Sequence, residues 1–279
     1  MHCGVMVTGY NQGDWDRLMK GEYDRPPEVS DAQNMDNTLY MGELVEPLGF
    51  DSIWATEHYG SAYSMQPNPL QYLAYWAGRT SRIDVGTAVI VALWWNPVRL
   101  ASEISMLDIL LKGRRLHLGI GRGIAPHEYA SLGYPIEQSH KYFYDVINAI
   151  RAADGAERFE FQGEVYNIPP TSIRPQARHK GDLTKNIKVA FSTETSAKMA
   201  AENGRVNPVD RELLIDVLPI DGRRVFSMIL TLCQHQEGLN ARCTPDDVVH
   251  GIRMPFLTGF VTIVFLFLHG TIFPSNTAE

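Results

Sequence analysis

Three short polar segments follow apolar runs of this sequence, and they hold the residue types that could do chemistry. Residues 56–59 (TEHY) provide a carboxyl group and an imidazole, and residues 121–123 (GRG) provide a cation between two glycines. Residues 191–195 (FSTET) provide hydroxyl groups at the start of a predicted helix, where backbone N–H groups and the helix dipole favour an anion. With the aromatic pair Trp94-Trp95, these segments predict a site for an anionic ligand with a flat apolar body.

Each of these features also has a plainer interpretation. His58 could be a hydrogen-bonded structural histidine, and Arg122 could pair with a neighbouring carboxylate. Ser192 and Thr195 could be ordinary helix caps, which is the commoner role of hydroxyl side chains before a helix. The aromatic pair could form an apolar wall or a substrate contact. The residue types alone therefore do not decide whether these side chains have catalytic or structural roles.

The apolar pattern places these segments after the strands of an alternating chain. Helical spacing and helix-start signals such as Asn68-Pro69 and Asn96-Pro97 predict helices at 31–48, from 69, from 97, at 139–153 and at 193–203. Short apolar runs between them predict strands at 4–8, 52–56, 84–91, 116–121 and 187–191. Five strand–helix units before residue 205 predict a parallel sheet. No glycine-rich dinucleotide fingerprint follows the first strand, which favours a barrel over a doubly wound sheet.

Two parts of the chain depart from this rhythm. Residues 159–168 (FEFQGEVYNI) predict a β-hairpin, with a proline-rich loop after it. Beyond residue 206 no strand–helix rhythm is visible. Residues 256–273 are apolar over 18 positions, which is the lower limit for crossing a bilayer and equally consistent with a pair of aggregation-prone strands. We expect residues 1–205 to form one barrel-like unit and 206–279 a divergent segment.

Composition narrows the function classes. The chain has 279 residues, 44% of them hydrophobic, and 25 basic against 32 acidic side chains give a net charge of −7. A mildly acidic, well-mixed surface carries no footprint for nucleic acid. The three cysteines, Cys3, Cys233 and Cys243, form no disulfide or zinc pattern and indicate a reducing compartment. No secretory signal is visible, so we expect a cytoplasmic α/β protein without a metal site.

Four blocks of the sequence together resemble the luciferase-like flavin-dependent monooxygenase family. They are GFDSIWATEHYG, RIDVGTAVIV followed by NPVRLASEISMLD, GRRLHLGIGRG, and NIKVAFSTETSAKMAAENG. They occur in the family's order and at its separations, from about residue 4 to 205. The resemblance implies a (β/α)8 barrel of the TIM type, of which about five units are recognisable here.

The resemblance also implies roles for particular residues. Glu57 and His58 fall on the family's catalytic pair, with the imidazole near the reactive edge of the flavin as base or hydrogen-bond donor. A cis peptide bond at the end of the third strand falls on Ala88-Val89. Arg122 falls on the arginine that contacts the flavin phosphate, and Ser192 and Thr195 fall on a second phosphate contact. The residues implied to bind the cofactor are thus Ala88, Val89, Arg122, Ile124, Ser192 and Thr195.

The implied function is a flavin-dependent monooxygenase. It would use reduced FMN, supplied by a separate flavin reductase, and O2 to oxidise a small organic substrate, and it would form a homo- or heterodimer. Alternatives are an F420-dependent oxidoreductase of the same fold, a non-catalytic flavin-binding or partner subunit, and an inactive truncated remnant. Gly121 and Asn96 replace a cysteine and a histidine of some bacterial luciferases, which argues against light emission.

The C-terminal part departs further from the family. Three more strands are expected after Arg205 to complete the barrel, and none is recognisable. An unclosed sheet of five strands would expose two edges and much apolar surface. We therefore expect the chain to be poorly stable unless residues 206–279 cover those edges.

Overall fold

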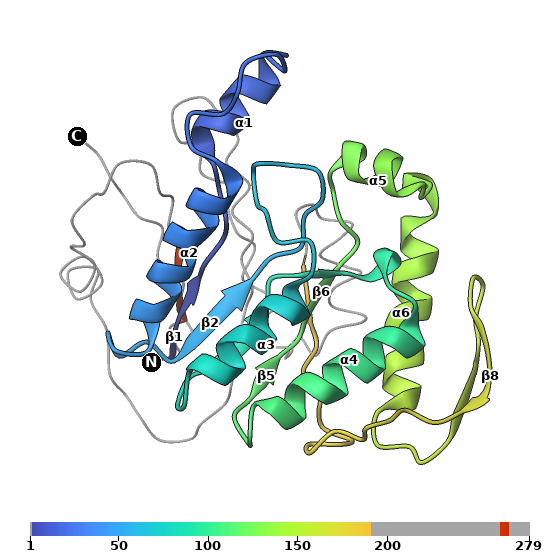
Figure 1. Ribbon diagram of the computed structural model, residues 1–279. Coiled ribbons are helices and arrows are strands. Elements are labelled where there is room, and N and C mark those ends of the chain that lie inside the picture. Colours follow the sequence, from blue (N-terminus) through green and yellow to red (C-terminus); the bar gives the residue numbers. More distant parts are fainter. Residues whose placement is uncertain (1, 191–262, 268–279) are drawn as a thin grey trace.

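The computed structural model describes residues 2–190 and 263–267 (Figure 1). One sheet has the strand order β10-β1-β2-β3-β5, and a shorter sheet has the order β4-β6-β9. All neighbours are parallel except β10 and β1. The strands are β1 (His2–Met6), β2 (Ser52–Ala55), β3 (Asp84–Thr87), β4 (Ile90–Val91), β5 (Leu116–His117), β6 (Gly119–Gly121), β9 (Lys188–Val189) and β10 (Ile263–Phe267).

The two sheets are successive halves of one layer, because β4 continues β3 and β6 continues β5. The predicted strands at 84–91 and 116–121 are thus each divided in two. The Thr87 side chain bridges the division: its Oγ1 donates to Gly119 O and accepts from Gly119 N, both at 2.9 Å. Each strand lies beside its predecessor in the chain, which is the order of a β/α barrel. The predicted fold class, an incomplete barrel of the TIM type, is confirmed.

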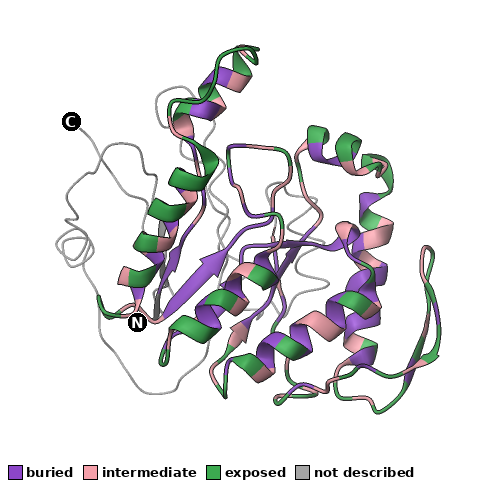
Figure 2. Ribbon diagram, in the orientation of Figure 1, coloured by how far each residue is buried: buried purple, intermediate pink, exposed green. Residues whose placement is uncertain are grey.

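Helices cover the outer face of this layer, and their starts follow the predicted signals. The Asn68 side chain accepts from Gln71 N, and the Asn96 side chain accepts from Val98 N and Arg99 N, so each caps its helix. Figure 2 shows buried strands and helices whose buried side faces them. The predicted helices are α2 (Asp31–Val45), α3 (Pro69–Arg79), α4 (Pro97–Leu110) and α6 (Ser139–Ala153); the helix predicted at 193–203 lies outside the described residues.

Two further helices were not predicted from the sequence. α1 (Gln12–Met19) follows β1, and α5 (Pro126–Leu132) follows β6. In Figure 1 both lie at the end of the molecule toward which the β2 arrow points. A short 3₁₀ turn, η1 (Ala92–Trp94), lies between β4 and α4, and a second, η2 (Ile136–Gln138), lies between α5 and α6. The strand-to-helix connections carry the candidate site described below.

The predicted hairpin is present as β7 (Phe159–Gln162) and β8 (Asn167–Thr171), which pair antiparallel. Asp145 of α6 fixes its turn, because the carboxylate accepts from the N–H groups of Glu164, Val165 and Tyr166 at 3.2, 2.7 and 2.8 Å. The hairpin therefore packs on the outer helical layer rather than extending the parallel sheet.

Residues 263–267 belong to the apolar segment for which two interpretations were open. They form β10, which pairs antiparallel with β1 over its whole length, from His2 opposite Phe267 to Met6 opposite Ile263. In the part of the chain that the structure describes, no helix combines the length and apolar character needed to cross a membrane. Residues 263–267 thus pair with the β1 edge of the sheet, which would otherwise be exposed.

Candidate active site

The loop after β2 is tied to the end of β1 by one buried side chain, Gln66. Its Nε2 donates to Val7 O at 2.6 Å, and its Oε1 accepts from Thr56 N at 3.0 Å. The Gln66 carbonyl also accepts from His58 N at 3.1 Å. The backbone of residues 56–59 is therefore held at the carboxyl end of the strands, where β/α barrels carry their reactive groups.

His58 is held by a carboxylate that the sequence analysis missed. Its Nδ1 lies 2.9 Å from Oε1 of Glu128 in α5, and Tyr59 N donates to the same oxygen at 2.9 Å. The Glu128 side chain is 1% exposed, while that of His58 is 24% exposed. The ring of Tyr63 meets the His58 ring edge-on at 5.3 Å. The histidine thus has one nitrogen fixed in the interior and part of its ring accessible.

The neighbouring residue, Glu57, is buried, with 2% of the residue exposed. Its Oε2 accepts from Val91 N at 2.7 Å, and its Oε1 accepts from Trp95 Nε1 at 2.9 Å and from the Tyr59 hydroxyl at 3.3 Å. Burial raises the pKa of Glu57 to about 8, although these three donors oppose the shift. The side chain fixes the end of β4 and the Trp95 ring in place.

The aromatic pair Trp94-Trp95 forms a wall rather than an exposed surface. Trp95 is buried, with 4% exposed, and its nitrogen is committed to Glu57. Trp94 packs edge-on against Tyr59 at 5.1 Å and against Tyr129 of α5 at 6.3 Å. These rings close the space between the β2 loop and α5.

The peptide bond between Ala88 and Val89 is cis, as the resemblance implied. Both residues are buried and cluster with Met6 and Trp54 on the face of the sheet away from the helices. A side chain at Gly121 of the neighbouring strand would place its Cβ 2.8 Å from Val89 Cγ2. Glycine is therefore the residue that lets β6 approach this bond.

Arg122 follows β6 directly, and its carbonyl accepts a hydrogen bond from the Tyr129 hydroxyl. Among the described residues no carboxylate forms a salt bridge with the Arg122 guanidinium. Ile124 is 61% exposed. Both side chains thus lie at the same end of the strands as His58, and Ser192 and Thr195 lie outside the described residues.

Two consecutive residues of α5 bring the two halves of the site together. Glu128 contacts the His58 ring and Tyr129 donates to the Arg122 carbonyl, so the β2 loop and the backbone after β6 are joined through one helical turn. The sequence held no clear signal for Glu128, because α5 has only 7 residues and shows no apolar periodicity. A carboxylate that contacts a histidine of another loop is recognisable only in three dimensions.

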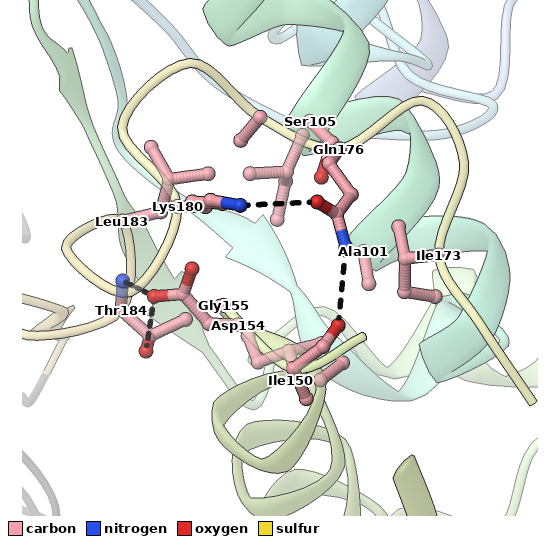
Figure 3. A pocket seen from close by; sticks show the side chains of 14 residues that line it. Ala101, Ser105, Ile150, Asp154, Gly155, Ile173, Gln176, Lys180, Leu183 and Thr184 are labelled. Atoms are coloured by element: carbon pink, nitrogen blue, oxygen red, sulfur yellow. Dashed lines mark hydrogen bonds between the residues drawn. The ribbon is translucent and has the colours of Figure 1, made fainter. Parts of the chain in front are cut away.

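A pocket lies in the outer layer, between α4, α6 and the loop before β9 (Figure 3). Its polar side chains bond one another: Lys180 Nζ donates to Gln176 at 3.3 Å, and Thr184 Oγ1 donates to Asp154 at 2.9 Å. None of the residues predicted to act in catalysis or cofactor binding lines it. We therefore treat the edge with His58 and Arg122 as the candidate active site.

The sequence resembles those of known flavin-dependent monooxygenases. The family model for luciferase-like monooxygenases matches residues 19–207. Protein y4vJ of Sinorhizobium fredii is 34% identical over 80% of this chain and 61% of its own length. The oxygenase component of the flavin-dependent trigonelline monooxygenase of Acinetobacter baylyi is 30% identical over 63% of this chain and 49% of its own.

A solved structure agrees with these sequence matches. The monooxygenase RslO1 of Streptomyces bottropensis superposes with a TM-score of 0.60 at 26% identity, over 72% of this chain and 57% of that one. This chain therefore spans between about half and three fifths of the length of the relatives it matches.

Proposed function

The chain belongs to the luciferase-like monooxygenase family, and from that premise we propose that it uses reduced FMN and O2 to oxygenate a small organic substrate. Reduced flavin would come from a separate reductase, as the description of the Acinetobacter relative as an oxygenase component suggests. The observation that carries the proposal is the short helix α5, whose Glu128 and Tyr129 hold His58 and Arg122 at one edge of the sheet.

The residues present fit a flavin phosphate and ring. Arg122 has no carboxylate partner among residues 2–190, and the flanking Gly121 lets β6 lie against the buried pair Ala88-Val89. Such a cation beside an apolar wall suits a dianionic group attached to a flat ring. Ser192 and Thr195, at a predicted helix start, remain our proposed partners of Arg122 for the phosphate.

The flavin, when bound, supplies the redox chemistry with O2, and the protein binds, orients and excludes water. His58 is the group that can hold or move a proton, because one of its ring nitrogens is engaged by Glu128 and the ring is partly accessible. Glu57 fixes β4 and Trp95 beside it. The rings of Tyr59, Trp94 and Tyr129 close one side of the space.

Anaerobic titration of the full chain with reduced FMN and with reduced F420, followed by rapid mixing with O2, tests the proposal. We expect FMN to bind at micromolar concentration and its oxidation to differ in rate from that of free flavin. Failure of FMN to bind at tens of micromolar contradicts the proposal. Binding of F420 alone would assign hydride transfer instead, and FMN binding without altered oxidation would assign a non-catalytic partner subunit.

We also propose that the chain pairs with a second copy or a related subunit, as sedimentation of the purified chain at increasing concentration would show. A chain that stays monomeric at all concentrations, alone and with the reductase, contradicts this part.

A further inference from the structure

Glu128 is an acidic side chain in a place that ordinarily excludes one. It is 1% exposed, and burying a carboxylate is unfavourable unless donors compensate it. Its Oε1 accepts from the backbone N–H of Tyr59 at 2.9 Å and lies at the same distance from the Nδ1 of His58. The oxygen that accepts from the Tyr59 N–H group therefore also faces the imidazole.

This contact determines which nitrogen of His58 carries the proton. Oε1 already accepts from the Tyr59 N–H group, so the same oxygen is oriented to accept from the imidazole, which corresponds to a proton on Nδ1. In the neutral ring Nε2 is then left with its lone pair. The same oxygen also holds the Tyr59 backbone, so the bond fixes the position of the β2 loop together with the orientation of the ring.

The helix that carries Glu128 is itself anchored on the cofactor side. The Tyr129 hydroxyl donates to the Arg122 carbonyl and lies 3.4 Å from the Gly123 carbonyl. Pro126 at the start of α5 and Gly133 in the left-handed conformation at its end define the helix on both sides. The distance between His58 and Arg122 therefore depends on this one helical turn.

We propose that Glu128 is a positioning residue that keeps His58 in the Nδ1-protonated tautomer, with Nε2 presented to the reacting groups at a separation from Arg122 set by α5. The proposal rests on the proposed function for its catalytic consequence. Its structural part, the tautomer, does not depend on any cofactor.

The test uses the full chain and the isosteric variant Glu128→Gln. Side-chain nitrogen NMR distinguishes the two imidazole tautomers, and the His58 signals are identified by their absence in His58→Gln. We expect Nδ1 protonation in the wild type and a mixture of tautomers in Glu128→Gln, because an amide can also present an N–H group. Wild-type His58 protonated on Nε2, or an unchanged tautomer in the variant, overturns the proposal.

Kinetics give the second readout. Glu128→Gln should lower kcat roughly 10- to 100-fold, the effect of removing an outer partner of a functional imidazole, with the KM for substrate and the affinity for FMN unchanged. Equal losses in kcat and in FMN affinity would indicate a merely structural role and overturn the proposal. Glu128→Asp, which keeps the charge, should recover part of kcat and the Nδ1 tautomer.

A matched control is Asp108→Asn, which alters a buried carboxylate bound to another histidine, His179. It should leave the His58 signals and kcat unchanged, and a loss equal to that of Glu128→Gln would overturn the specific role of Glu128. The results distinguish failure of the proposed role of Glu128 from failure of the proposed flavin function. A tautomer that depends on Glu128 in a chain without flavin activity contradicts only the proposed function.

Discussion

Two buried carboxylates of this protein each contact the Nδ1 of a histidine and accept from one backbone N–H group, and they lie in different layers of the fold. Glu128 contacts His58 Nδ1 and accepts from the Tyr59 N–H group. Asp108 of α4 lies 2.7 Å from His179 Nδ1 and accepts from the His179 N–H group at 2.9 Å. Both acids are almost fully buried, and each histidine is partly exposed. Glu128 makes both contacts through Oε1, whereas Asp108 uses Oδ1 for the ring and Oδ2 for the backbone.

Their surroundings differ. His179 belongs to the loop before β9 that borders the pocket of Figure 3, and its bonds attach that loop to the outer surface of α4. His58 stands at the carboxyl end of the strands, and its partner helix also contacts Arg122. Position in the barrel, rather than the carboxylate–histidine pair itself, is what marks one of them as a candidate for catalysis.

Replacing each histidine by alanine should change kcat very differently. His58→Ala should lower kcat about 10²- to 10⁴-fold, the usual contribution of a positioned proton-transfer group. His179→Ala should leave kcat unchanged, since its loop contacts α4 on the outer layer. Steady-state and rapid-mixing assays of both variants with FMN, O2 and a shared substrate measure this. Equal activities of His58→Ala and wild type would show that the two pairs are both structural.

Glu57 gives a pH-dependent prediction for the same edge. Its pKa is about 8 in the folded protein against 4.5 for a free side chain, so the folded state retains a proton that the unfolded state has lost. The free energy of unfolding should therefore fall as pH rises from about 4.5 to about 8, by up to ~1.4 kcal/mol per pH unit from this group.

Chemical unfolding of wild type and Glu57→Gln across that pH range measures this contribution. The variant is expected to be less stable at low pH, because its amide N–H group would face the Val91 or Trp95 donors, but to lack this part of the slope. Identical slopes in the two proteins would show that Glu57 is ionised in the fold throughout.

How much of this could be read from the sequence depends on how local each feature is. The starts of α3 and α4 were predictable because Asn68 and Asn96 cap the helix within a few residues. The division of the strand at 84–91 was not visible, because its apolar pattern continues unbroken through Ala88-Val89. The cis bond there was expected only from the family resemblance.

The site shows the same limit more sharply. His58 and Arg122 could be singled out because each follows a strand. Glu128 could not, because its partner lies 70 residues earlier in the chain. The enclosure of Glu57 was equally hidden, since the donors that surround it, Val91 and Trp95, come from the next strand-to-helix connection. Contacts between these loops arise only when the chain has folded, and they leave no pattern in a single sequence.

Asp108→Asn tests the structural member of the comparison. The amide can keep one of the two bonds to His179 and leaves a buried N–H₂ group without its own partner. The expected loss is about 1–3 kcal/mol in the free energy of unfolding. Urea unfolding measures the loss, and FMN titration should show unchanged affinity. Weakened FMN binding without loss of stability would mean that the outer layer communicates with the site, and the distinction between the two pairs would then fail.

The two side-chain contacts of α5, made by Glu128 and Tyr129, can be tested separately. Tyr129→Phe removes the hydroxyl that donates to the Arg122 carbonyl while keeping the ring against Trp94. It should cost about 0.5–1.5 kcal/mol of stability and weaken FMN binding slightly, since the segment around Arg122 loses its anchor. The His58 tautomer should not change, because Glu128 is untouched. The control is Tyr144→Phe, which also removes one tyrosine hydroxyl, at a residue of α6 that packs on Phe143. A changed tautomer in Tyr129→Phe alone would mean that α5 moves as a unit, so that the Arg122 anchor also orients His58.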